Sequence, residues 1–228
     1  MKRLLGLFLF ITVALAMVSA QSITELKAAS EAAIKVATAA PNDYAANWMA
    51  AKAQRKYGAE LVTTEAANWK TVAKAAAKEG IKFGEIAQKL NPNGIEGWYW
   101  YGLCVGTYAD CVSILTALGE GLKGKTQKGF EMAYKVDKMY DNGGPMLSLG
   151  RFWQVLPGIA GKDLKKAEQL FNEYIGLFSA SKEANKDAWY YRGALYKELG
   201  KTPEARADLQ KASSMGQKDA AKLLSELK

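Results

Sequence analysis

The sequence predicts an all-α protein, an α-solenoid in which helical hairpins stack in a row. The clearest indication is residues 187–212, which read as two helices joined by a short turn. The same spacing of apolar residues recurs earlier in weaker form, and no convincing stretch alternates apolar and polar residues as a strand would. Because one hairpin cannot bury its apolar face alone, the repeats are expected to stack in one domain over residues 21–228.

The closing segment shows the repeat spacing best. Trp189, Gly193 and Tyr196 fall at i, i+4 and i+7, which places them on one stripe of a helix. Gly200 is expected to end that helix, because glycine adopts the left-handed C′ conformation without a clash at Cβ.

A second helix is expected to begin at Thr202-Pro203-Glu204, with a hydroxyl N-cap, a proline at the first helical position and an acid at the positive helix end. Ala205, Leu209 and Ala212 repeat the stripe, and Gly193 facing Ala205 lets the two backbones pack closely. This order of residues resembles the tetratricopeptide repeat, whose period is about 34 residues, although the usual closing proline is absent.

Residues 1–20 predict a secretory signal peptide. Lys2 and Arg3 precede an apolar run, and Val18-Ser19-Ala20 supplies small residues for cleavage before Gln21. An uncleaved membrane anchor stays open as an alternative, because the run approaches the length of a membrane span. No cysteine stands at the cleavage site, so this is not the signal of a lipoprotein, and membrane anchoring is in doubt. The expected location is periplasmic or secreted.

The first helix after the signal is marked at both ends. Ser22 and Glu25 have the spacing of a capping box, which opens a helix that runs to about Ala39. Pro41-Asn42-Asp43 then predicts a turn and the N-cap of the next helix.

Thr63 or Thr64 is expected to cap a third helix, which passes through Trp69. That helix ends at Leu90 against Asn91-Pro92. Together these helices are interpreted as divergent repeats that stack before the clearer ones.

Two further units occupy the middle of the chain. After a closing Asn91-Pro92, apolar residues return at the spacing of the closing hairpin, and after the inserted segment LPGIAG a second helix completes the later unit. The inward positions that this frame predicts are Trp98, Gly102 and Val105, then Met146, Gly150 and Trp153, then Ala167 and Phe171.

Aromatic runs suggest a binding surface. In the repeat frame Trp98 and Trp189 pack inward, whereas Tyr99 and Tyr190 turn to the concave side, the surface that solenoids use for binding. Simple packing between hairpins is the alternative, because aromatic side chains mostly pack. The residues predicted to line one continuous inner surface are Glu96, Tyr99, Leu103, Arg151, Gln154, Asp187, Tyr190 and Lys197.

Residues 119–126, GEGLKGKT, match the pattern of a phosphate-binding loop, in which Lys125 and Thr126 would meet phosphate and Mg²⁺. Such a loop needs a preceding strand and a surrounding parallel sheet, and neither is predicted. The segment is therefore interpreted as a connection between helices.

Cys104 and Cys111 are the only cysteines, and seven residues along one helix separate them by roughly 10 Å, too far for a disulfide. A break at Gly106 could bring them together. Buried free thiols are the preferred interpretation.

Catalysis finds little support in the composition. The chain has no histidine, which removes the usual general base and metal ligand near neutral pH, and no nucleophile motif is present. Without Lys2 and Arg3 the chain keeps 29 basic and 23 acidic residues, a net charge of +6, and the lysines are scattered rather than clustered. We therefore expect that the protein is not an enzyme and that it binds no cofactor, metal or nucleic acid.

The middle of the chain resembles the TRAP transporter T-component (TatT) family, which are periplasmic helical-repeat partners of tripartite ATP-independent periplasmic transporters. The resemblance covers roughly residues 60 to 215. The residues that carry it are Asn91-Pro92, Glu96-Gly97, Tyr99-Trp100, Gly144-Pro145 and Leu149-Gly150.

This resemblance implies an α-solenoid that contacts a periplasmic solute-binding protein and holds small apolar ligands in an internal cavity. The function expected first is a non-enzymatic binding or scaffold protein, accessory to solute uptake. The competing function is a carrier of a small apolar ligand in an aromatic-lined cavity, without a protein partner. A homo-oligomer is left open.

Overall fold

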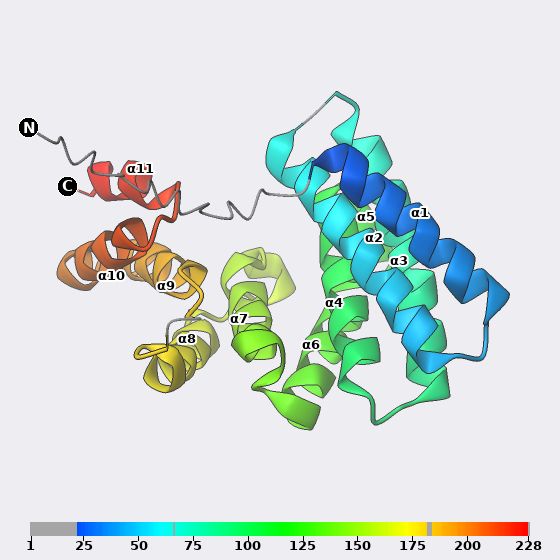
Figure 1. The fold of residues 1–228 in the computed structure, drawn as a ribbon. Helices are drawn as coiled ribbons and strands as arrows, with labels where there is room; N and C mark the ends of the chain where they lie inside the picture. Colours follow the sequence, from blue (N-terminus) through cyan, green and yellow to red (C-terminus); the bar gives the residue numbers. More distant parts are fainter. Residues whose placement is uncertain (1–21, 66, 182–183, 228) are drawn as a thin grey trace, which may run out of the picture.

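The computed structural model describes residues 22–65, 67–181 and 184–227, and the predicted signal peptide lies outside this part (Figure 1). Within it the chain forms eleven α-helices and one 3-10 turn, with no strand. They are α1 (Ile23–Ala39), α2 (Tyr44–Thr64), α3 (Trp69–Leu90), α4 (Ile95–Asp110), α5 (Ile114–Gly119), α6 (Leu122–Asp137), α7 (Tyr140–Val155), η1 (Gly158–Ala160), α8 (Leu164–Phe178), α9 (Asp187–Glu198), α10 (Thr202–Ser214) and α11 (Ala220–Ser225).

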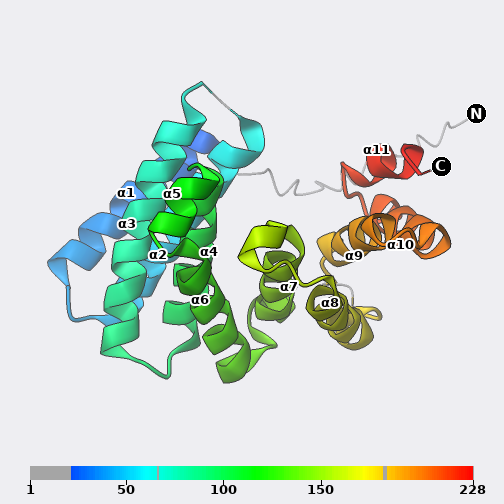
Figure 2. The same cartoon turned by 180° about the vertical axis from the view of Figure 1, so that it is seen from behind.

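The helices pack mainly against their neighbours in the chain, as in a solenoid. In the N-terminal arm, α1–α6, helix α2 lies between α1 and α3, and α4 lies between α3 and α6. The C-terminal arm, α7–α11, continues from α6 and packs α7 on α8, then α9 on α10. Figures 1 and 2 show the second arm leading away from the first. The predicted all-α solenoid of stacked hairpins is confirmed.

Two predicted helix starts are confirmed by their caps. The backbone N–H of Glu25 donates to Ser22 Oγ at 3.2 Å, and the N–H of Ser22 donates to Glu25 Oε2 at 2.8 Å. Asp43 caps α2 by accepting from the N–H of Ala46 at 2.9 Å. These bonds satisfy donors that the first helical turn leaves without a partner.

Two other predicted caps are wrong. Helix α2 continues through Thr63 and Thr64, whose hydroxyls donate to the carbonyls four residues earlier, and α3 begins only after Asn68, at φ 60°. A threonine can bond inside its own helix in this way, so its presence need not mark a helix start. Likewise α10 begins at Thr202 itself, with Lys201 as the N-cap and no side-chain cap bond.

The predicted repeat frame is confirmed by burial. Most of the large residues on its inward stripes lie in the core, namely Trp98, Val105, Met146, Trp153, Phe171, Trp189 and Leu209, whereas Tyr196 is only half-buried. Tyr99, which the frame placed on the concave side, is buried as well. Close helix crossings occur where the frame placed glycine: a Cβ at Gly193 would lie 2.8 Å from Leu209 Cγ. Helices α4 and α6 approach even more directly, because a Cβ at Gly129 would lie 2.8 Å from the Cα of Gly102.

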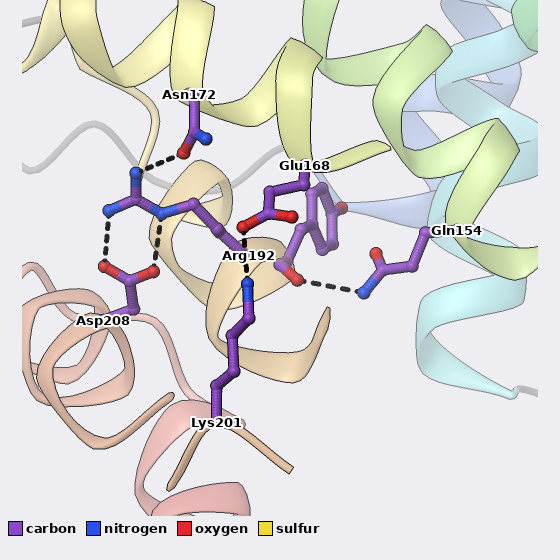
Figure 3. A network of polar contacts seen from close by, with 7 residues as sticks. Gln154, Glu168, Asn172, Arg192, Lys201 and Asp208 are labelled. Carbon is purple, nitrogen blue, oxygen red and sulfur yellow. Dashed lines mark hydrogen bonds and ion pairs between the residues drawn. The ribbon is translucent and has the colours of Figure 1, made fainter. Parts of the chain in front are cut away.

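A polar network joins the helices of the C-terminal arm (Figure 3). The Arg192 guanidinium donates from Nε and Nη2 to the two carboxylate oxygens of Asp208, at 2.7 and 2.8 Å, and from Nη1 to Asn172 at 2.8 Å. Lys201 pairs with Glu168 at 3.0 Å. Since Asn172 belongs to α8, Arg192 to α9 and Asp208 to α10, one side chain fixes three helices relative to one another.

Candidate functional site

A half-open cavity of about 1080 Å³, here called the central cavity, is bounded by both arms. Helices α2, α4, α5 and α6 supply one side, and α7, η1 and α9 supply the other. Much of the wall is aromatic or aliphatic, and its large side chains include Tyr99, Trp100, Leu103, Phe130, Phe152 and Tyr191. A cavity of this size and lining suits an organic molecule of moderate size.

Three of the eight predicted surface residues line the central cavity: Tyr99, Leu103 and Arg151. The first two come from α4, and Arg151 comes from α7. The structure therefore brings part of the predicted set together across the two arms.

The other five predicted residues lie outside the cavity. Glu96 accepts a hydrogen bond from the Tyr44 hydroxyl at 2.8 Å, and Lys197 forms an ion pair with Glu226. Asp187 accepts from Gln217 at 3.4 Å, and Tyr190 lies beside Tyr191 with ring centroids 5.9 Å apart. Gln154 is buried, and its amide donates to the carbonyl of Tyr191 at 2.9 Å (Figure 3).

Tyr99 is held firmly within the wall. Its ring meets Trp100 and Tyr140 edge-on, at centroid distances of 5.0 and 5.4 Å, and its hydroxyl lies against Gly144. Burial raises the pKa of Tyr99, the negative charge of Asp141 raises it further, and a hydrogen bond with Ser148 opposes both. The hydroxyl therefore stays protonated at physiological pH.

Sequence reasoning missed the charged groups that share the cavity with Arg151. Arg55 on α2, Asp110 at the end of α4 and Asp141 at the start of α7 all line it. Among the described atoms, Arg55 Nε is buried and has no hydrogen-bond partner. In the sequence, Arg55 stands out only because most of the basic residues in this chain are lysines.

The charges in the cavity influence one another without touching. Burial raises the pKa of Asp110, and the positive charges of Arg55 and then Arg151 lower it. The Asp110 side chain is exposed to solvent, but that solvent lies in a cavity surrounded by protein. Its pKa is therefore still affected by burial. Among the described residues none of these three forms an ion pair within 4.0 Å.

The segment with the phosphate-loop pattern is not a loop over most of its length. Helix α5 ends at Gly119, Gly121 turns the chain at φ 66°, and α6 begins at Leu122. Lys125 and Thr126 thus lie within a helix that follows another helix. The interpretation as a connection between helices holds for residues 120–121.

Both cysteines are free thiols, and α4 runs through Gly106 without the break that a disulfide would need. Cys104 is buried, its Sγ donates to the carbonyl of Ala51, and burial raises its pKa to about 12. Cys111 is only half-buried, so the expectation of two buried thiols is correct for Cys104 alone. Its place after the last turn of α4 explains the difference.

The described part of the chain contains no group of three or more histidine, cysteine, aspartate or glutamate residues placed to hold a metal ion. Nor does any of its helices have the length and apolar character needed to cross a bilayer.

The architecture defines a helical-repeat protein with a hollowed inner face. Two solved structures share it: TTC0263, a thermophilic TPR protein from Thermus thermophilus, and the MamA protein. TTC0263 is similar over 90% of this chain and 91% of its own, with a TM-score of 0.62 and 17% identity. MamA is similar over 87% and 86%, with a TM-score of 0.53 and 17% identity.

At this identity the likeness shows the fold alone, and it makes the chain an α-solenoid of tetratricopeptide-like hairpins. No protein-family model matches the sequence, and no curated protein matches it.

Proposed function

We propose that this chain is a non-enzymatic periplasmic binding protein that serves TRAP-type solute uptake by contacting a periplasmic solute-binding protein. The observation that carries the proposal is the solenoid with its inner face hollowed between two arms. Solenoids use such concave faces to bind partners. The resemblance of residues 60 to 215 to the T-component family supports the choice of partner, and the signal-like residues 1–20 support the location.

Two half-buried residues of the predicted surface test this partner. We expect Arg151→Ala and Tyr190→Ala each to weaken binding by about 1–2 kcal/mol, because arginine and tyrosine are common anchors at interfaces. Neither side chain is fully buried, so both variants should fold. Titration calorimetry with a purified TRAP-class solute-binding protein from the same organism measures the change.

The matched control is Arg206→Ala, which removes an exposed arginine of α10 that does not line the central cavity. It should leave the affinity unchanged. Absence of binding to any TRAP-class solute-binding protein, or equal losses in all three variants, would contradict the proposed partner.

A second candidate function is a carrier of a small apolar ligand, and the central cavity favours it. Its volume of about 1080 Å³ lies just above the range of roughly 300–1,000 Å³ that is usual for ligand sites. Phe130, Phe152 and Trp100 give it the apolar wall that such a ligand needs.

Gly106 offers a way to fill the cavity without disturbing the fold. It lies on α4 and lines the cavity, and a Cβ added there would meet nothing within 4 Å. We expect Gly106→Phe to abolish binding of the neutral fluorescent probe N-phenyl-1-naphthylamine. The melting temperature should be unchanged or higher, because glycine within a helix is destabilising.

Gly176→Phe is the control, since Gly176 also lies within a helix, has open space around a Cβ and does not line the cavity. Probe titrations of both variants decide the matter. If Gly106→Phe binds the probe as well as Gly176→Phe does, the cavity is not the ligand site.

A further inference from the structure

The guanidinium of Arg55 enters the wall of the central cavity without a partner. Its Nε is buried and has no hydrogen-bond partner among the described atoms, and none of the ion pairs formed by the described residues involves Arg55. A buried donor left without a partner is costly, so native proteins leave few of them, and each calls for an explanation. A bound acceptor inside the cavity would provide one.

Arg151 approaches the same cavity from the opposite arm, and its neighbours fix its position. Its guanidinium lies over the Tyr191 ring at 4.8 Å from the centroid, and Nη1 donates to Gln154 Oε1 at 3.0 Å. Gln154 is fixed in turn by its bond to the carbonyl of Tyr191. These contacts use one of the five donors of Arg151, so the group is oriented and still has donors to offer.

The two arginines line the same cavity from opposite arms. Both also act electrostatically on the carboxyl of Asp110 and on the hydroxyl of Tyr191, which line the cavity with them. Asp110 does not neutralise either by contact, since no ion pair within 4.0 Å joins them among the described residues. A planar guanidinium suits a carboxylate, which can accept two parallel N–H bonds from it.

The charges of the whole lining set the charge of the ligand. Four basic side chains line the cavity, Arg55, Lys56, Lys123 and Arg151, against three acidic ones, Glu60, Asp110 and Asp141. The surplus is one positive charge. A ligand with a single negative charge would balance it.

The apolar part of the wall sets the rest of the ligand. Trp100, Phe130 and Phe152 lie on both arms and supply apolar ring surface, and the indole N–H of Trp100 is already used by the Tyr140 hydroxyl. A ligand that is acidic at one end and has an apolar body would use both the arginines and these rings.

We propose that the central cavity binds an aromatic or branched aliphatic monocarboxylate, with its carboxylate held between Arg55 and Arg151 and its apolar body against the aromatic wall. The proposal rests on the carrier function proposed above and names the class of ligand.

A matched pair of compounds tests it: 1-naphthaleneacetate, which carries the charge, and 1-naphthaleneacetamide, which has the same shape without it. Titration calorimetry on the whole protein should show the acetate bound at least about tenfold more tightly, the ratio expected when a charge-assisted bond replaces a neutral one. Arg55→Met and Arg151→Met should each weaken the acetate about tenfold or more and leave the amide within about twofold.

Arg206→Met is the control variant, and it should change neither affinity, because Arg206 is exposed and lies outside the cavity. Arg55→Met should also keep or raise the melting temperature, since it removes an unpaired buried donor. Should that variant fail to fold, Arg151→Met carries the test alone.

Equal affinities of wild type for the two compounds, or methionine variants that affect both alike, would overturn the carboxylate class. The carrier function would then still stand if Gly106→Phe blocks the neutral probe. If neither naphthalene compound binds, the proposed class is wrong. If the neutral probe also fails to bind in the cavity, the carrier function fails with it.

Discussion

Replacing Phe171 by alanine is expected to lower the free energy of unfolding by about 3–5 kcal/mol. The side chain is fully buried where α8 packs on α7, and a Cβ at Gly150 would lie only 2.7 Å from its ring. Alanine would therefore leave a cavity that the closely packed backbone of α7 cannot collapse to fill. Urea unfolding followed by circular dichroism measures the loss.

Leu177→Ala, on the same helix, is the control for Phe171→Ala. Leu177 is 51% exposed, so its truncation should change stability by about 0.5 kcal/mol or less. Similar losses for the two variants would mean that α8 does not pack on α7 through the face that carries Phe171.

The second large effect is expected at the ion pair of Arg192 and Asp208. Their side chains are 19% and 8% exposed, and two hydrogen bonds join them. Asp208→Ala leaves the Arg192 guanidinium with Asn172 as its remaining partner, and removal of one member of a buried pair costs about 3–5 kcal/mol. Arg192 is not wholly buried, so the lower end of that range is expected.

Replacing both partners separates the two causes of this loss. The double variant Arg192→Met with Asp208→Leu removes the pair and leaves no charge unpaired, so it should be more stable than Asp208→Ala alone. On the surface, Glu31→Ala breaks a pair with Lys27 whose members are 60% and 59% exposed, and should cost less than about 1 kcal/mol. A double variant as unstable as the single one would show that the pair itself, and not an unpaired charge, supplies the stability.

The repeat frame could be predicted because neighbouring residues encode it. Trp189 and Gly193 sit at a spacing that a helix turns into one buried stripe, and glycine occurs where two helices meet, here against Leu209 of the next helix. The same local logic placed the caps at Ser22 and Asp43 correctly. It failed at Thr63 and Thr64, because a hydroxyl inside a helix can bond to a carbonyl of its own helix.

The binding surface was predicted only in part because no spacing encodes how distant helices meet. Tyr99 and Tyr190 hold equivalent places in the repeat frame, yet only Tyr99 lines the central cavity. Arg55 lies on a helix that was interpreted as a divergent repeat. Two structural features distinguish it: its Nε has no hydrogen-bond partner, and it lines the same cavity as Arg151 of the other arm. When a charged residue shares a cavity with a residue about a hundred positions away, the local sequence around it shows no pattern that predicts this.

The connection between the arms gives the cavity a thermodynamic property. After α6 the chain turns through Asp141, Asn142 and Gly143, all in the left-handed region at φ 50°, 54° and 78°, before the regular part of α7 begins. The wall is thus made by two arms joined at this turn, and an occupant touching both would favour the arrangement of the arms that fits it best. A protein that docks across the same two arms and favours the same arrangement would raise the affinity for the occupant by some factor. By linkage, the occupant would raise the affinity for that protein by the same factor. Loading and docking would then be two measurements of one coupling free energy.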